Sequence, residues 1–131
     1  MSEILTKYIR IEDWKKEKHT PFIEYVGEVK KDAPITVRVT VGKEIPHPNT
    51  TEHHIRWIKL LFIPKDSSFI IDIGRAEFNS HGESPSGPNK SGIYTEPTAY
   101  FTFKTNKPGK LVALSYCNIH GLWAYEKELE F

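Results

Sequence analysis

Short runs of alternating apolar and polar residues constrain the fold of this chain more than any other feature of its sequence. The clearest run is ITVRVTV at 35–41, where apolar residues alternate with Thr36, Arg38 and Thr40. A period of two places the apolar side chains on one face of a β-strand. Six further runs have a related pattern and are bounded by turn-forming residues: 22–29, 55–63, 69–78, 98–105, 110–117 and 122–130. The sequence therefore predicts an all-β fold, a seven-stranded antiparallel immunoglobulin-like β-sandwich.

The length and composition predict one domain. A chain of 131 residues can bury a single hydrophobic core, so we expect residues 1–131 to form one domain. Residues 1–16 are predicted to be a short N-terminal extension with a helical turn or two, for which Asp13 is a plausible N-cap. A single cysteine excludes an intramolecular disulfide, and a net charge of +1 indicates no nucleic acid. With no leader and no bilayer-length apolar run, we expect a cytoplasmic protein without a membrane partner.

The connections between the predicted strands fall into two sets. In an antiparallel sandwich, successive connections lie at alternate ends of the fold. Counted from the segment before the first strand, every second connection is 42–54, 79–97 or 118–121. That first segment and these three connections contain all six histidines, and the only cysteine, Cys117, directly precedes the last connection. Strand direction therefore predicts that the thiol and every imidazole lie at one end: His19, His47, His53, His54, His81 and His120.

One thiolate with several imidazoles on a rigid scaffold is typical of a transition-metal site. Cys117 and His120 are spaced so that both can bind one ion, and prolines on both sides hold His47 in an extended conformation. Three metals remain possible on the residues alone. Electron-transfer copper requires an axial Met or Gln, but the chain has only Met1 and no Gln. Zinc prefers four ligands, which is fewer than the candidate imidazoles and thiol at this end of the fold. Five-coordinate iron would use more of these candidate ligands and keep one position open.

Three motifs carry a resemblance to a known family. They are EKHTP at 17–21, KEIPHPNTTEHHIRW at 43–57 and SYCNIHGLW at 115–123, with further likeness at 81–84 and 94–97. They resemble the iron-binding motifs of superoxide reductase in its one-iron form, also called neelaredoxin, which is related to the iron-binding domain of desulfoferrodoxin. The two-centre form has an additional N-terminal desulforedoxin-like domain with four cysteines. We therefore expect this chain to be the one-centre form, without that domain.

The resemblance implies one iron ion that cycles between Fe²⁺ and Fe³⁺. The implied ligands are four equatorial imidazoles and one axial sulfur: His19, His47, His53, His120 and Cys117. Glu17 is implied as a sixth ligand in the oxidised state only. Lys18 is implied as the cation near the open position that attracts superoxide and helps to deliver a proton. His54 matches the member of the family's His-His pair that does not bind the metal.

The resemblance also implies an activity, which is the one-electron reduction of superoxide to hydrogen peroxide without dismutation. It further implies a role in detoxification, a rubredoxin-like electron donor and a homotetramer. The alternative from another class is an electron-transfer metalloprotein, such as a cupredoxin-like copper carrier. Such a carrier needs no exchangeable position at its metal.

Overall fold

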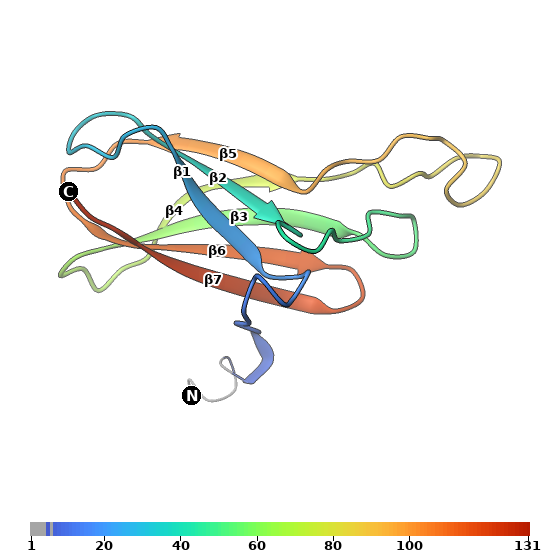
Figure 1. The fold of residues 1–131 in the computed structure, drawn as a ribbon, viewed down its shortest axis with the longest axis horizontal. Coiled ribbons are helices and arrows are strands. Elements are labelled where there is room, and N and C mark those ends of the chain that lie inside the picture. Colours follow the sequence, from blue (N-terminus) through green and yellow to red (C-terminus); the bar gives the residue numbers. More distant parts are fainter. Residues whose placement is uncertain (1–4, 6) are drawn as a thin grey trace.

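Two antiparallel sheets packed face to face make up the computed structural model, which describes residue 5 and residues 7–131 (Figure 1). One sheet has the strand order β1-β2-β5 and the other β4-β3-β6-β7. The strands are β1 (Pro21–Val26), β2 (Ile35–Val41), β3 (Ile55–Pro64), β4 (Ile71–Glu77), β5 (Thr98–Phe103), β6 (Gly109–Cys117) and β7 (Gly121–Leu129). Each predicted run overlaps one of these strands, with bounds that differ by at most three residues, and the predicted immunoglobulin-like sandwich is confirmed.

The alternation within each strand produces the core between the sheets. In β2, Ile35, Val37, Val39 and Val41 are at most 2% exposed, and the residues between them are half-buried. β6 has the same alternation, which ends inward at Cys117. Because a strand of period two presents one face to its partner sheet, Cys117 is fixed at the edge of the core by the same pattern that forms the fold.

A β-bulge lies where β3 begins. Ile55 pairs with Cys117, whereas Trp57 pairs with the preceding residue Tyr116, so Arg56 is an extra residue in β3. A bulge bends its strand and changes the direction of the chain next to it. The bulge therefore lies where the connection 42–54 enters β3, beside the last residue of β6.

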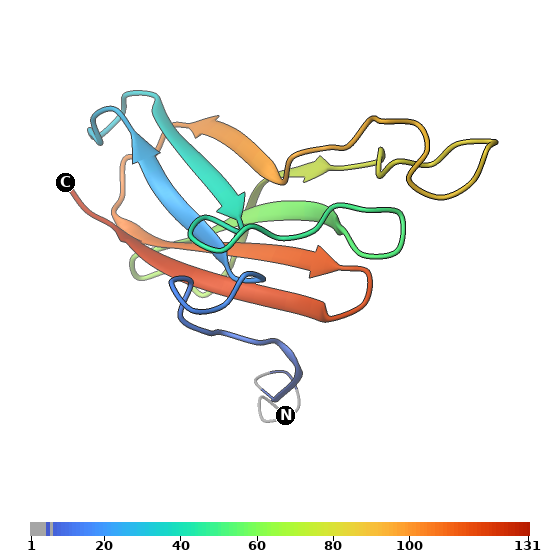
Figure 2. The same cartoon turned by 45° about the vertical axis from the view of Figure 1, so that its right-hand side comes forward.

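The connections 42–54, 79–97 and 118–121 lie at one end of the sandwich, on the right of Figures 1 and 2, and the C-terminus lies at the other. The end of the N-terminal extension runs beside β7, where Arg10 N donates to Leu122 O at 3.1 Å and Ala124 N donates to Arg10 O at 2.8 Å. This pairing brings the segment before β1 to the end that contains the three connections.

The predicted cap in the extension is present as a local turn. Asp13 Oδ1 accepts a hydrogen bond from Lys15 N at 3.0 Å, and Asp13 O accepts from Glu17 N at 2.9 Å. One helical bond, from Ile9 N to Leu5 O, precedes it. The prediction for residues 1–4 and 6 falls outside the described residues. Within the described part of the chain, no helix has the length and apolar character needed to cross a membrane.

Candidate metal centre

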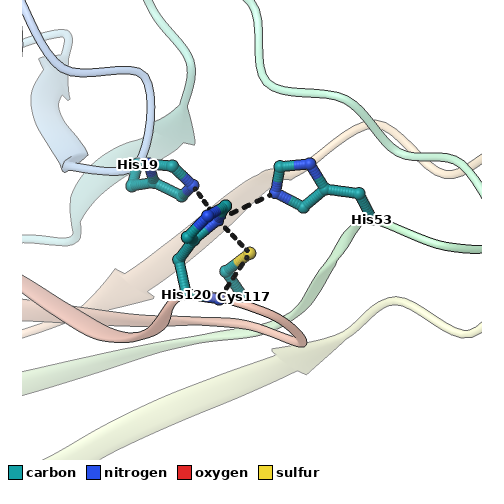
Figure 3. Close-up of side chains that lie close together, drawn as sticks. All are labelled: His19, His53, Cys117 and His120. Atoms are coloured by element: carbon teal, nitrogen blue, oxygen red, sulfur yellow. Dashed lines mark hydrogen bonds between the residues drawn. The ribbon is translucent and has the colours of Figure 1, made fainter.

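Four separate segments deliver histidine and cysteine side chains to one point. His19 directly precedes β1, His47 and His53 come from the connection between β2 and β3, Cys117 ends β6, and His120 lies in the turn before β7. Figure 3 shows His19, His53, Cys117 and His120 pointing toward one another. The strand directions predicted from sequence therefore do bring these residues together.

The donor atoms of four of these side chains converge. The candidate ligand atoms of His19, His53, Cys117 and His120 all lie within 4.8 Å of one another. His120 Nδ1 lies 3.0 Å from His19 Nε2, 3.2 Å from His53 Nε2 and 3.7 Å from Cys117 Sγ. Converging imidazole nitrogens beside a thiol sulfur form a donor set that suits a transition-metal ion.

His47 completes this cluster as a fifth side chain. Its ring centroid lies 4.7 Å from that of His19 and 4.6 Å from that of His53. Its Nδ1 donates to Pro48 O, so the lone pair is on Nε2. Among the described residues, nothing hydrogen-bonds to His47 Nε2, although this atom is buried. Because an unpaired buried nitrogen is costly, a cation between the rings would satisfy it.

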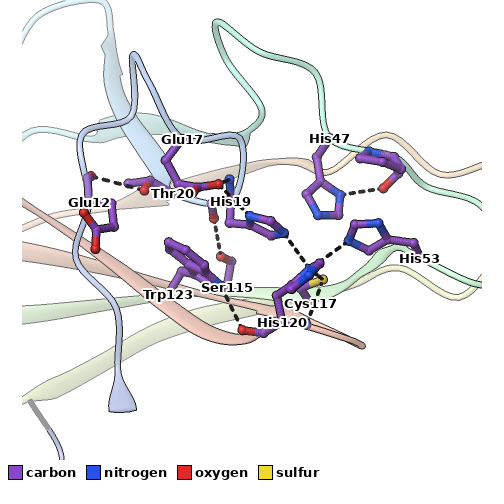
Figure 4. Close-up of polar contacts among 11 residues, drawn as sticks. Glu12, Glu17, His19, Thr20, His47, His53, Ser115, Cys117, His120 and Trp123 are labelled. Carbon is purple, nitrogen blue, oxygen red and sulfur yellow. Dashed lines mark hydrogen bonds and ion pairs between the residues drawn. The ribbon is translucent and has the colours of Figure 1, made fainter. Parts of the chain in front are cut away.

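Neighbouring side chains orient His19 and His120 (Figure 4). Glu17 Oε1 accepts a hydrogen bond from His19 Nδ1 at 2.6 Å, which leaves Nε2 free to face the cluster. Ser115 Oγ donates to His19 O at 3.3 Å, and the Trp123 ring stacks on His19 with centroids 4.8 Å apart. Trp123 Nε1 also donates to His120 O at 3.2 Å. Glu17 and Trp123 therefore fix the direction of the His19 imidazole, as partners of metal-binding histidines commonly do, and Trp123 also holds the backbone of His120.

The sulfur of Cys117 lies in the core and has a backbone donor. The Cys117 side chain is fully buried, and its Sγ accepts a hydrogen bond from His120 N at 3.4 Å. An N–H group directed at sulfur orients it and is a common partner of a sulfur that binds a metal. The short turn after β6 therefore positions two candidate ligands relative to each other.

Burial also sets the protonation state of the imidazoles. It lowers the pKa of His19, His47 and His53 from the ordinary value of 6.5, and that of His47 to about 3. The positive charge of Lys18 contributes to the lowered pKa of all three. The rings are therefore neutral near pH 7, as metal ligands must be.

The sequence profile of the family described as Desulfoferrodoxin matches residues 11–126. This chain belongs to the desulfoferrodoxin family. It is 59% identical over 127 residues to the superoxide reductase of Pyrococcus furiosus, covering 97% of this chain and all of that protein. It is 53% identical over 115 residues to the neelaredoxin of Megalodesulfovibrio gigas, covering 88% of each chain. The predicted family is thus confirmed.

A solved structure of a desulfoferrodoxin relative has the same fold. The superoxide reductase (neelaredoxin) from Archaeoglobus fulgidus in the reduced form superposes with a TM-score of 0.89 at 56% identity. The superposition covers 95% of this chain and 99% of that one. The sandwich and its connections are therefore those of the family over nearly the whole chain.

Two of the six histidines lie at the same end of the fold without joining the cluster. The His54 and His81 rings stack on each other, with centroids 3.5 Å apart and an interplanar angle of 7°. His54 Nδ1 donates to Thr50 O at 2.9 Å, and His81 Nε2 donates to Phe78 O at 2.7 Å. Strand direction could not separate these rings from the other four. Their own hydrogen bonds direct them away from the cluster.

Sequence reasoning assigned no role to Ser115 or Trp123. Ser115 is fully buried two residues before Cys117, so the alternation of β6 places both on the inward face. The sequence did contain a signal for Ser115, which is a polar residue at an inward position of a strand that ends at a candidate ligand. A buried hydroxyl needs a hydrogen-bond partner, so a contact with a neighbouring candidate ligand could have been predicted. Trp123 gave no such signal, since tryptophan within a strand is usually a packing residue.

The lowered imidazole pKa values predict that acid destabilises the metal-free protein. The folded pKa of His47, about 3, lies below the unfolded value of 6.5, so the unfolded chain binds the proton first as the pH falls. The free energy of unfolding should have its full value above pH 6.5. Between pH 6.5 and pH 3 it should decrease as the pH falls, by at most about 1.4 kcal/mol per pH unit for one proton. Urea unfolding between pH 8 and pH 4 measures this dependence. His47→Gln should give a shallower slope, and an equal slope would contradict the assignment.

Proposed function

We propose that this chain is a superoxide reductase, which uses one electron and two protons to reduce superoxide to hydrogen peroxide at a mononuclear non-haem iron centre and does not dismutate it. The observation that carries the proposal is the convergence of four imidazoles and one thiol, with the buried Nε2 of His47 lacking a partner among the described residues. Relatives that cover nearly the whole chain bear the name superoxide reductase. The motifs that match the family are the segments that bring the donor atoms together.

The donor set fits iron better than the alternatives. Its proposed members are one thiolate and four imidazoles: Cys117, His19, His47, His53 and His120. Five donors exceed the four of a zinc tetrahedron, and neither a Gln nor a methionine other than Met1 exists to complete a copper electron-transfer site. We therefore do not favour the copper carrier. Iron held by these residues would supply the electron for the reduction of a small anion as it passes from Fe²⁺ to Fe³⁺.

Lys18 is proposed to attract the substrate. It is half-buried and directly precedes His19, and its charge lowers the pKa of three candidate ligands, so it acts at the cluster itself. A cation at the mouth of an anion site raises the local concentration of superoxide and provides a nearby ammonium proton source. Lys18 is therefore proposed as a catalytic residue.

Glu17 is proposed to have two positions. In the structure its carboxylate binds the outer nitrogen of His19, on the side of the ring away from the converging donor atoms (Figure 4). The sequence-based prediction, a sixth ligand of the oxidised iron, requires the side chain to leave His19. Glu17 would then orient a ligand in one state and occupy the open position in the other.

Two substitutions of Glu17 separate these roles. Glu17→Gln keeps an oxygen that can accept from His19 Nδ1 but is a poor ligand for Fe³⁺, so we expect iron affinity and activity to be largely retained. Glu17→Ala removes the orienting bond as well and should weaken iron binding about 10- to 100-fold. Iron affinity and the absorption change on adding azide to the oxidised protein are the measurements. Equal iron affinity in both variants would contradict the orienting role.

The proposed activity has a direct test. Purified protein loaded with iron and supplied with a reductant should consume superoxide and yield hydrogen peroxide without oxygen. Stoichiometric release of oxygen would show dismutation and overturn the proposal. Oxidised protein whose spectrum does not respond to cyanide or azide would instead favour an electron carrier.

Further features of the family resemblance belong to the same proposal. We propose a rubredoxin-like electron donor, and the exposed side chain of His120 supports this because it gives a docked donor a short path to the metal. We also propose a homotetramer, a cytoplasmic location with a role in detoxification, and a single iron-binding domain over 1–131. The single core shared by both sheets supports the last point.

A further inference from the structure

His53 differs from His19 and His47 in how its ring is held. His19 and His47 each use the outer ring nitrogen to bind a partner, Glu17 and the carbonyl of Pro48 respectively. In the described part of the chain, no residue hydrogen-bonds to Nδ1 of His53, whose contacts are made by Nε2 and by its backbone. The position of the His53 ring therefore depends on the backbone that carries it.

Asn118 binds that backbone on both sides of His53. Its Oδ1 accepts a hydrogen bond from His54 N at 2.8 Å, and its Nδ2 donates to Glu52 O at 2.9 Å. Its own backbone N donates to His54 O at 3.1 Å. Asn118 directly follows Cys117, so these bonds continue the pairing of β3 with β6 past its last pair, Ile55 with Cys117.

We propose that Asn118 is a positioning residue, whose side-chain amide fixes the distance between His53 and Cys117. The inference rests on the proposed metal centre. A carboxamide is required because one side chain must accept from His54 N and donate to Glu52 O at the same time. Aspartate offers acceptors alone, and leucine offers neither group.

A second group of bonds holds the same connection and should keep it folded when Asn118 is changed. Thr51 N donates to Asn89 Oδ1 at 2.9 Å, Asn89 N donates to Thr51 Oγ1 at 3.1 Å, and Thr51 Oγ1 donates to His81 O at 2.6 Å. The connection 79–97 therefore holds the segment before His53 independently of the turn after β6. Loss of the Asn118 amide should loosen His53 without unfolding its connection.

The test is Asn118→Asp, assayed by competition of the metal-free protein with a chelating dye for Zn²⁺. We expect Zn²⁺ affinity to fall about 10- to 100-fold, as it does when an outer partner of a metal ligand is lost. The added negative charge alone would strengthen cation binding, so a weakening reports the lost N–H donor. Asn106→Asp makes the same chemical change at an exposed position in the connection from β5 to β6, and it should leave Zn²⁺ affinity unchanged. This connection lies at the opposite end of the sandwich (Figure 1). Asn118→Ala is the second variant, with the same expectation, if the aspartate variant does not fold.

A double-mutant cycle shows whether Asn118 acts through His53. In a His53→Ala background, four candidate ligands remain, and Asn118→Asp should change Zn²⁺ affinity less than about 3-fold. Two results would overturn the inference. One is a loss of Zn²⁺ affinity of about 10- to 100-fold from Asn118→Asp in the His53→Ala background, and the other is an Asn118→Asp single variant that binds Zn²⁺ as tightly as the wild type does. Wild-type protein that binds no metal would instead overturn the metal centre, so the two failures are distinguishable.

Discussion

Replacing Cys117 with serine is expected to abolish both the sulfur-to-iron absorption band of the oxidised protein and its superoxide reductase activity. A thiolate donates electron density to iron, and a serine hydroxyl at neutral pH does not. Cys117 is fully buried, and serine is nearly isosteric with it, so the fold should persist. The loss of activity should exceed the about 10- to 100-fold cost of removing an outer partner of a ligand.

The measurement is the visible spectrum and the rate of superoxide consumption of iron-loaded Cys117→Ser protein. Ser115→Ala is a suitable control, because Ser115 lies on the same inward face of β6 and contacts His19 only through its carbonyl. It should keep the band, although at a lower iron affinity. A band that survives in Cys117→Ser would show that the sulfur is not a ligand.

Replacing Lys18 with alanine is expected to slow the capture of superoxide by about 10- to 1,000-fold at low ionic strength. The substrate is an anion, and Lys18 is the cation whose charge acts on His19, His47 and His53. Because salt screens such an attraction, the wild-type rate should fall as ionic strength rises and the variant rate should change little. Iron should remain bound, since Lys18 is not among the proposed ligands.

Two control variants separate the charge of Lys18 from its position in the chain. Lys16→Ala removes the same charge from an exposed position two residues earlier and should reduce the rate far less. Lys18→Arg keeps the charge and should recover the salt dependence. The rate constant for superoxide decay after pulse radiolysis, measured over a series of salt concentrations, separates these variants. An unchanged salt dependence in Lys18→Ala would contradict electrostatic capture.

The turns and strands of this protein were predictable because they depend on local chemistry. The alternation of β2 and β6 follows from one buried face, and each strand overlaps a predicted run. The bulge at Arg56 was not predicted, since nothing in IRWIKLLFI distinguishes an extra residue from the regular alternation. Its position depends on how β3 pairs with β6, which is a contact between distant segments.

The sequence by itself determined the strands, their directions and therefore the end of the fold at which every imidazole and the thiol lie. The tertiary structure alone decided which rings converge: His53 faces His120, whereas its neighbour His54 stacks on His81. It also decided that Glu17 binds the outer edge of His19 and that Asn118 joins the segments of His53 and Cys117. The physical reason is that a side chain's direction depends on hydrogen bonds to residues far away in sequence, and no local pattern encodes these partners.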